Sequence, residues 1–431
     1  MQPPPPESAV SPVRPSLRSR ASTRGHGRDS LLGAGSNLAV YALSLLTGPL
    51  LARALGPAGR GDLAAVLTPT QLWVWLTAFG IPGATAYYAT TRDRRELINS
   101  AWLVTLVVNV PLAVAVWVLA PHYLHGHDPV TVSWLRAIVS VGVFALPAFS
   151  ALNHLNGSGR SVPFHVLRQL APLGYALGVL VLAAAGALTL RSALAVSFAT
   201  TVAGYGASLL VGRGLPSRRF QRATTAAQLR FGSRLAIGMS ASLAVGRLDQ
   251  LVMVRLVASA ELGFYAVAAT AASAGGALSQ GLALALFPRI RQATSGRQRR
   301  RETRRAVRWV LIGSVSMAAA IALSAPFVVP ALFGDGFRTA VPALWILLPG
   351  QVASDLTTVA GTALQARGEP GLATRAQLLA AALTIVAIVP AVHRFGIGGA
   401  AAVTSTSQFA ALAYLWARGF RGRSWNDAAA L

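Results

Sequence analysis

Apolar segments long enough to cross a membrane recur along the whole chain, and short gaps containing Arg separate them. A helix needs about 20 residues to span the hydrocarbon core of a bilayer. The sequence therefore predicts an all-α integral membrane protein with about twelve transmembrane helices. The predicted spans are residues 31–54, 61–89, 97–120, 132–155, 163–187, 190–212, 231–256, 260–288, 306–332, 339–364, 372–392 and 396–417.

The basic residues indicate the orientation of these spans. All 38 are Arg, and 29 of them fall in the tails and in every second gap, whereas the alternate gaps hold seven. Short cytoplasmic loops carry an excess of basic residues. We therefore expect a multi-pass protein of the cytoplasmic (inner) membrane with both the N- and C-termini in the cytoplasm.

Composition excludes several other classes of protein. The net charge of +25 resembles that of a nucleic-acid-binding protein, but the Arg residues flank apolar runs, and no soluble domain is left to carry a basic face. Anionic membrane lipid is therefore the expected partner of these charges, and nucleic acid is not. The chain has no Cys, which excludes disulfides, thiolate nucleophiles and Cys-based metal sites.

Composition also divides the chain into segments. The N-terminal segment is rich in Pro, Ser and Arg and has too few apolar residues to fold, so we expect a disordered cytoplasmic tail there. Two six-helix lobes follow, joined by a basic cytoplasmic linker, and a second tail ends the chain. The predicted boundaries are a tail at 1–30, a lobe at 31–212, a linker at 213–230, a lobe at 231–417 and a tail at 418–431.

An internal repeat supports the division into two lobes. Residues 46–68 align with 248–270 at an offset of 202, which pairs Arg53 with Arg255 and Gly61 with Gly263. The LNGSGR and LQARGE segments, at 155–160 and 364–369, align at a similar offset. Because six is even, both lobes would share one orientation in the membrane.

Several stretches resemble one family of membrane proteins. They are GPLLARALGPAGRGDLAAV at 48–66, LDQLVMVRLVASAELGFYAVA at 248–268, LALFPR at 284–289, ALFG at 331–334 and LQARG at 364–368. Their order and spacing are similar to those of Wzx-type polysaccharide flippases in the multidrug/oligosaccharidyl-lipid/polysaccharide exporter superfamily. The resemblance implies a two-lobe, non-enzymatic protein that flips polyprenyl-diphosphate-linked oligosaccharides by alternating access, for cell-surface polysaccharide synthesis. No cofactor or metal is expected.

Two acidic residues, Asp249 and Asp355, fall well inside predicted spans. An ionisable side chain at membrane depth usually faces a cavity or a partner. We expect Asp249 and Asp355 to serve ion coupling or gating between the lobes. A purely structural ion pair is the alternative.

Arg side chains are the candidates for binding a diphosphate, because the guanidinium makes bidentate hydrogen bonds and keeps its charge. The candidates are Arg247, Arg53, Arg168 and Arg255. Arg168 lies near the end of its span, where snorkelling to the membrane surface is the alternative. For Arg53 and Arg255 the alternative is a structural role, in which they cap the first and the seventh span, respectively.

Neutral polar side chains mark a sugar-binding cavity. Asn37 and Tyr41 follow helical spacing in the first span, and both can hydrogen-bond sugar hydroxyls. Polar packing between helices is the alternative. Further candidates of this kind are Ser44, Tyr87, Tyr88, Gln351 and Thr357. The cluster of His122, His125, His127 and Asp128 has no metal-ligand spacing, so we predict an exposed loop there.

Other functions remain as alternatives. A lipid II flippase is the nearest, although such proteins often carry more than twelve helices. A drug/cation antiporter would need acids deep in the spans of the first lobe, which contain none at depth, since Asp62 lies at the outer edge of the second span. A glycosyltransferase or polymerase would need a larger aqueous loop. A non-transporting membrane scaffold is the fourth alternative.

Overall fold

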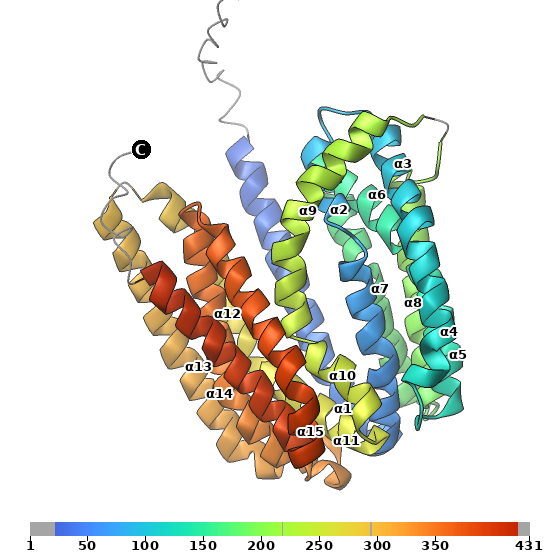
Figure 1. The fold of residues 1–431 in the computed structure, drawn as a ribbon, viewed down its shortest axis with the longest axis vertical. Coiled ribbons are helices and arrows are strands. Elements are labelled where there is room, and N and C mark those ends of the chain that lie inside the picture. The colour runs from blue at the N-terminus through green and yellow to red at the C-terminus, as the bar shows by residue number, and fades with distance from the viewer. Residues whose placement is uncertain (1–21, 218, 294, 421–431) are drawn as a thin grey trace, which may run out of the picture.

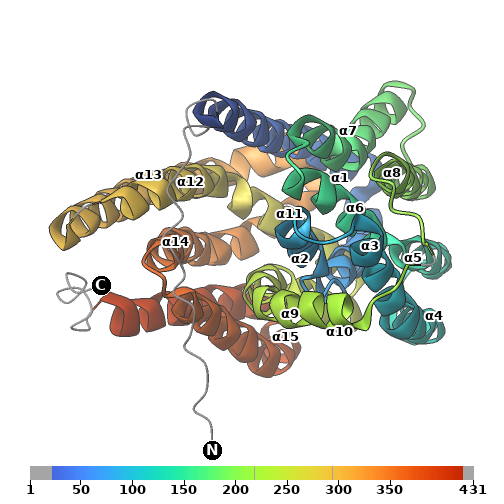
Figure 2. The same ribbon diagram turned by 90° about the horizontal axis from the view of Figure 1, so that it is seen from above.

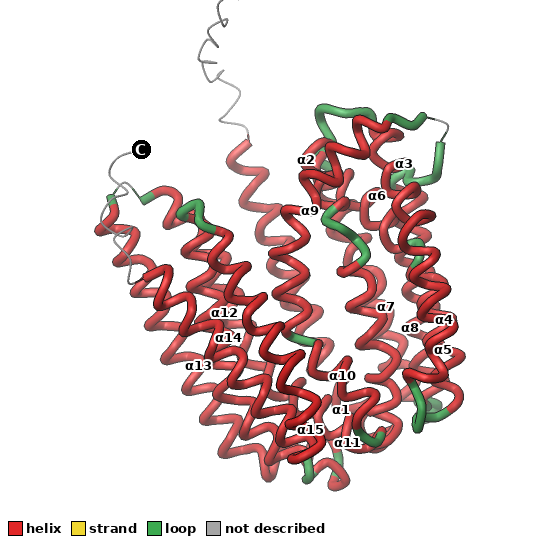
Figure 3. Tube along the Cα trace, in the orientation of Figure 1, coloured by secondary structure: helices red, strands yellow, loops and turns green. Residues whose placement is uncertain are grey.

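The computed structural model describes residues 22–217, 219–293 and 295–420, and every element within them is helical (Figure 3). The helices are α1 (Ser22–Leu76), α2 (Ile81–Tyr88), α3 (Arg94–Val104), α4 (Val110–Tyr123), α5 (Pro129–Gly142), α6 (Ala145–Gly157), α7 (Ser161–Ala184), α8 (Leu190–Val211), α9 (Arg222–Val245), α10 (Leu248–Leu256), α11 (Ser259–Ala272), α12 (Gly276–Gln292), α13 (Gly296–Phe333), α14 (Ala340–Ala366) and α15 (Pro370–Leu415). Short 3-10 or π turns are η2 (Thr105–Asn109), η3 (Ser273–Gly275), η4 (Asp335–Phe337) and η5 (Trp416–Phe420).

The surface and the helix lengths are those of a multi-pass membrane protein. In the described residues, five helices are long and apolar enough to cross a membrane, or up to seven if each of two bent pairs counts as one span. Large apolar side chains stand exposed on their outer faces, among them Leu323, Phe327 and Val386. Such a surface is stable in lipid and unfavourable in water. The membrane class is confirmed, while the count of about twelve spans stays a prediction.

Glycines place the sharpest bends. Gly56 (φ 66°) kinks α1, which contains the first predicted span and the start of the second. Gly396 (φ 57°) kinks α15 in the same way, between the last two predicted spans. Left-handed backbone is accessible to glycine at little cost. Gly80 (φ 66°) ends the second predicted span early and begins α2, with a proline in the first helical turn.

Three helices begin inside segments that were predicted to be polar connections. α1 begins at Ser22, within the predicted tail at 1–30, whose first 21 residues lie outside the described residues. α9 begins at Arg222, within the predicted linker. α13 begins at Gly296, ahead of the predicted span at 306–332, and the hydroxyl of Ser295 caps it by accepting from the Gln298 amide. Each helix thus carries Arg-rich turns beyond its apolar part.

The helices run roughly side by side, and the chain divides into two halves. Figures 1 and 2 show α12–α15 on one side and α3–α6 with α8 on the other, with α1 and α9 between them. We call residues 22–212 the N-terminal half and residues 222–420 the C-terminal half. The end of the molecule where α1, α9 and α13 begin is the Ser22 end, and the opposite end, where α1 bends, is the Gly56 end.

The largest apolar core joins the two halves. It includes Leu63 from the N-terminal half and Leu262 and Leu344 from the C-terminal half. Helix α1 packs closely against α11 in this core. Two smaller cores, formed by α12–α15, lie wholly in the C-terminal half.

Candidate functional site

A cavity of about 500 Å³ lies between the two halves. Its walls come from α1 and α7 of the N-terminal half and from α10, α11, α14 and α15 of the C-terminal half. Three of its lining residues carry charge, namely Arg60, Arg247 and Asp249. Two guanidinium groups against one carboxylate leave an excess of positive charge, which favours an anionic ligand.

Arg60 is the charged residue of the cavity lining that was not predicted from the sequence. It follows the Gly56 kink of α1, and its Nε atom is buried without a hydrogen-bond partner among the described residues. Its charge interacts with that of Arg247 across the cavity. The predicted spans ended at residue 54 and resumed at 61, which placed Arg60 in a loop. A long arginine side chain reaches well beyond the position of its backbone.

Arg247 stands where the helix of the predicted span 231–256 breaks. The chain turns at Gly246 and Arg247, and α10 begins at Leu248. The Arg247 side chain is exposed to the cavity and lies 3.4 Å from the Gln250 side-chain oxygen. The break thus points one of the four predicted cationic residues into the cavity.

Asp249 is buried beside Arg247, but its carboxylate has partners of its own. It accepts hydrogen bonds from the Gln250 amide at 2.7 Å, from Thr404 at 3.0 Å and, at short range, from the Tyr265 hydroxyl. Thr404 lies on α15 and Tyr265 on α11. The carboxylate therefore ties three helices of the C-terminal half together at the cavity wall.

Asp355 is buried on α14, behind the cavity wall. It accepts hydrogen bonds from Ser279 at 2.9 Å, Ser314 at 2.7 Å and Gln351 at 2.9 Å. All three donors are neutral, and Gln351 also lines the cavity. Thr357, a predicted neighbour, bonds the Ala353 carbonyl of its own helix instead.

The other predicted arginines lie outside this cavity. Arg53 donates hydrogen bonds to the carbonyls of Leu332 (2.8 Å) and Ala331 at the end of α13, so it caps this helix and not its own, which was the alternative predicted. Arg255 lines a separate apolar pocket with His122 and Tyr123.

Arg168 is exposed on α7 and is not among the residues that line the cavity. Asn37 and Tyr41 fall on α1 in a stretch whose side chains lie outside the described residues, as does Ser44. Tyr87 packs flat against Phe231 of α9, with ring centroids 4.4 Å apart, and Tyr88 packs edge-on against both rings. These two tyrosines therefore serve packing between the halves.

A tight seam closes the Gly56 end of the molecule. A Cβ atom on Gly61 would lie 1.7 Å from the Ser259 carbonyl oxygen, and one on Gly263 would lie 2.0 Å from the Pro57 carbonyl oxygen. Only glycine permits so close an approach of two backbones. We call this contact between Pro57, Gly61, Ser259 and Gly263 the glycine seam.

Asp62, His127 and Ser259 form a polar cluster beside the glycine seam. His127 Nδ1 lies 2.8 Å from the Asp62 carboxylate, and Nε2 lies 2.9 Å from the Val254 carbonyl. Ser259 Oγ donates to Asp62 at 2.7 Å. The cluster thus links the loop after α4 and the bend of α1 to α10 and α11 of the other half.

The prediction of an exposed loop is correct for His125 and Asp128. His122 is exposed but lies in the last turn of α4, and the prediction is wrong for His127, whose side chain is 1% exposed. Burial alone would lower the pKa of His127, but its hydrogen bonds to Asp62 and Val254 and the charge of Asp62 raise that pKa above its ordinary value. Both ring nitrogens face acceptors, which suits the doubly protonated imidazolium. The described residues contain no cluster of three or more His, Cys, Asp or Glu that could hold a metal ion.

Solved structures share this architecture. The chain aligns with a structure titled lipid II flippase MurJ in an inward closed conformation at a TM-score of 0.75 and 11% identity, covering 88% of this chain and 86% of that one. It aligns with an inward-facing multidrug resistance MATE transporter of the MOP superfamily at 0.68 and 14% identity, covering 89% and 97%. At such identities the likeness shows the fold alone. Fold and surface together define a multi-pass membrane protein with this architecture.

Sequence relatives give the family. Residues 27–294, more than half of the chain, match the family described as polysaccharide biosynthesis protein, and the chain belongs to that family. The chain is also 28% identical over 137 residues to a probable low-salt glycan biosynthesis flippase, Agl15, from Haloferax volcanii. That match covers 30% of this chain and 28% of the relative. The resemblance to Wzx-type flippases is therefore confirmed.

Proposed function

We propose that this protein flips a polyprenyl-diphosphate-linked oligosaccharide across the cytoplasmic membrane, for the synthesis of cell-surface polysaccharide. The observation that carries this proposal is the pair of arginines facing one cavity from opposite halves of the molecule. Arg60 Nε has no partner among the described residues, and two like charges in one cavity attract a multivalent anion. A diphosphate supplies that charge and accepts several hydrogen bonds from guanidinium groups.

The proposed mechanism is alternating access between two six-helix lobes with twelve spans in all. The seam supports this reading, because the repeat offset of 202 pairs Gly61 with Gly263 and Pro57 with Ser259. Gly61 packs on Ser259 while Gly263 packs on Pro57, as two equivalent turns related by a two-fold axis would do. Opening this seam and closing the Ser22 end would move the head group from one side to the other.

The proposed orientation places the Ser22 end, both termini and the linker in the cytoplasm. The start of α13 fits this orientation, because Thr303, Ala306 and Val310 are buried on one face while Arg301, Arg304, Arg305 and Arg308 are exposed. Such a face suits anionic lipid headgroups. The Gly56 end would then face outward.

Roles for the other predicted residues follow from their places. Asp249 and Asp355 are proposed for ion coupling or gating, since both are buried acids at or behind the cavity wall. Asn37 and Tyr41 stay predictions for glycan contact. We assign Arg53 to helix capping. We do not assign Arg168 or Arg255 to diphosphate binding, because neither residue lines the cavity.

A drug/cation antiporter is a weaker proposal. The cavity lining carries two arginines and one acid, and this excess of positive charge disfavours a cationic ligand. Asp62, although buried in the N-terminal half, bonds His127 and Ser259 outside the cavity lining. No enzymatic step is proposed, in keeping with a family and structural neighbours that are flippases and transporters.

The test is flipping in proteoliposomes that contain fluorescent undecaprenyl-diphosphate sugar. The account expects protein-dependent exposure of the sugar in the far leaflet and its loss in a double variant, Arg60→Gln with Arg247→Gln. Arg338→Gln is the matched control, since Arg338 is exposed and paired with Asp335. The proposal would be rejected if the double variant flipped the sugar as fast as the unaltered protein. It would also be rejected, in favour of the antiporter or scaffold, if the unaltered protein flipped none of several glycans under an imposed ion gradient.

A further inference from the structure

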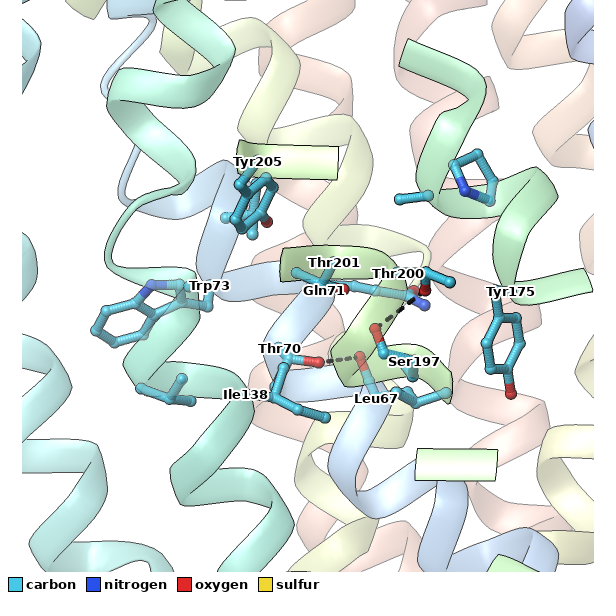
Figure 4. A pocket seen from close by; sticks show the side chains of 15 residues that line it. Leu67, Thr70, Gln71, Trp73, Ile138, Tyr175, Ser197, Thr200, Thr201 and Tyr205 are labelled. Carbon is cyan, nitrogen blue, oxygen red and sulfur yellow. Dashed lines mark hydrogen bonds between the residues drawn. The ribbon is translucent and has the colours of Figure 1, made fainter. Parts of the chain in front are cut away.

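A second cavity lies inside the N-terminal half and adjoins the central one. It measures about 320 Å³ and is enclosed by α1, α5, α7 and α8 (Figure 4). Leu67, Gln71 and Tyr175 line both cavities, so the two share a wall. We call it the N-terminal pocket. Its volume falls at the lower end of the range of roughly 300–1,000 Å³ for small-molecule sites.

Helix α1 presents one face to the N-terminal pocket. Leu67, Thr70, Gln71 and Val74 recur at helical spacing and line it together. The hydroxyl of Thr70 donates to the carbonyls of Val66 and Leu67 in its own helix. Its oxygen therefore keeps a lone pair with which it can accept a hydrogen bond from a ligand.

The N-terminal pocket contains buried donors that lack a partner. Trp73 is 8% exposed, and among the described residues neither its Nε1 nor the Tyr175 hydroxyl has a hydrogen-bond partner. Figure 4 shows Trp73 and Tyr175 on opposite sides, with Gln71 and Thr201 between them. Buried donors without acceptors are unfavourable, so such groups indicate that an occupant with acceptors belongs there.

The lining also limits the chemistry of that occupant. Among the residues that the structure describes, no acidic or basic side chain lines the N-terminal pocket, so a charged ligand would find no counter-charge from them. A lipid chain would leave the Trp73 and Tyr175 donors unpaired. Val74, Ile138 and Pro172 offer apolar contacts beside the polar groups. A sugar ring matches this mixture, because it combines hydroxyl oxygens with apolar C–H faces.

We infer that the N-terminal pocket binds a neutral sugar ring of the lipid-linked substrate while Arg60 and Arg247 hold the adjoining diphosphate. This inference rests on the proposed function and adds a place for the glycan. Tyr175 joins the two sites, since it lines both cavities. The sugar attached to the diphosphate would then lie next to the bound phosphates.

The test compares two kinds of ligand, one without a sugar and one that carries a single sugar. Native mass spectrometry would measure binding of undecaprenyl diphosphate and of undecaprenyl diphosphates carrying glucose, galactose or N-acetylglucosamine. Trp73→Phe and Thr201→Val each remove one hydrogen-bonding group from the N-terminal pocket and leave the central cavity unchanged. We expect affinity for at least one sugar-bearing ligand to fall about tenfold in each variant, with affinity for undecaprenyl diphosphate unchanged.

Trp345→Phe is the control, because it removes an indole whose Nε1 bonds the Ala322 carbonyl away from both cavities. An equal loss for both kinds of ligand would mean that Trp73 is structural, and no loss would mean that water fills the pocket. Equal affinity of the unaltered protein for bare and sugar-bearing lipids would also overturn the inference, with the diphosphate site intact. If the unaltered protein bound neither ligand, the proposed function itself would fail.

Discussion

The buried acids of the C-terminal half and the buried donors beside the cavities of the N-terminal half differ in their hydrogen bonding. In the C-terminal half, Asp249 and Asp355 each accept three hydrogen bonds from neighbouring groups. In the N-terminal half, Arg60, Trp73 and Tyr175 hold buried donor atoms that have no partner among the described residues. Buried carboxylates that accept hydrogen bonds from several helices stabilise the packing of those helices. Buried donors without a partner beside a cavity instead favour a ligand that is rich in acceptors. The two sets should therefore respond differently to mutation.

The largest effect on stability is expected at Asp355. Asp355→Leu would leave Ser279, Ser314 and Gln351 without their acceptor, at a cost of about 3 kcal/mol or more in the free energy of unfolding. Denaturant titration in mixed micelles would measure this loss. Asp335→Leu is the control, because Asp335 is exposed. A loss below about 1 kcal/mol would show that the cluster does not hold α12, α13 and α14 together.

The opposite result is expected for Arg60. Arg60→Gln would weaken binding of undecaprenyl diphosphate by about 10–100-fold without lowering the melting temperature, because Arg60 Nε has no partner to lose. Arg53→Gln should do the reverse, since Arg53 bonds the Leu332 and Ala331 carbonyls and lies outside the cavity. Thermal unfolding and native mass spectrometry on both variants would measure this contrast. If the two variants lost the same affinity for undecaprenyl diphosphate and the same melting temperature, the distinction between ligand-binding and structural arginines would be wrong.

A smaller effect is expected at the glycine seam. Gly61→Ala would place a Cβ against the Ser259 carbonyl and lower the population of the closed seam by about tenfold. Because the chain has no Cys, spin labels at Ala58→Cys and Glu261→Cys would report the distance across the seam. Gly206→Ala, a change into open space on α8, is the control. An unchanged distance distribution would show that the seam does not open.

The smallest expected effect is a dependence of the seam on pH. Asp62 is the charged group shown in contact with His127, and its hydrogen bond contributes to raising the pKa of His127 in the closed seam. The stabilisation is therefore complete below the ordinary histidine pKa of about 6.5 and is lost as pH rises through the higher closed-state pKa.

The same spin-label pair should show a few-fold fall in the closed population between about pH 5.5 and 8.5. His127→Gln should abolish that dependence and His125→Gln should retain it, since His125 is exposed. A retained dependence in His127→Gln would assign it to another group.

Sequence predicted the features that depend on local pattern. Long apolar runs predicted the membrane helices, although the predicted span at 61–89 runs through the break that Gly80 makes before α2. Arg247 and Asp249 were expected at the functional site, and both line the cavity. The membrane helices could be predicted because hydrophobicity acts on the backbone close to where it occurs, whereas the roles of Arg247 and Asp249 stay predictions.

Sequence could not predict the features that depend on long-range contact. His127 bonds Asp62, 65 positions away, and Ser259, 132 positions away, so an isolated loop pattern gave no sign of its burial. Arg60 was not predicted as a cavity residue, because the predicted boundaries of the first two spans differ from the observed helix by a few residues. The repeat offset pairs Gly61 with Gly263, and both glycines lie in the seam, but an alignment gives equivalence and not contact.

The central claim, a diphosphate site formed by Arg60 and Arg247, is tested most directly by a comparison of head groups. Native mass spectrometry would measure the affinity of the purified protein for undecaprenyl diphosphate, undecaprenyl phosphate and undecaprenol. The account predicts that affinity falls in that order and that the Arg60→Gln, Arg247→Gln double variant loses the preference. Equal affinity for all three lipids, or a preference that survives in the double variant, would contradict it.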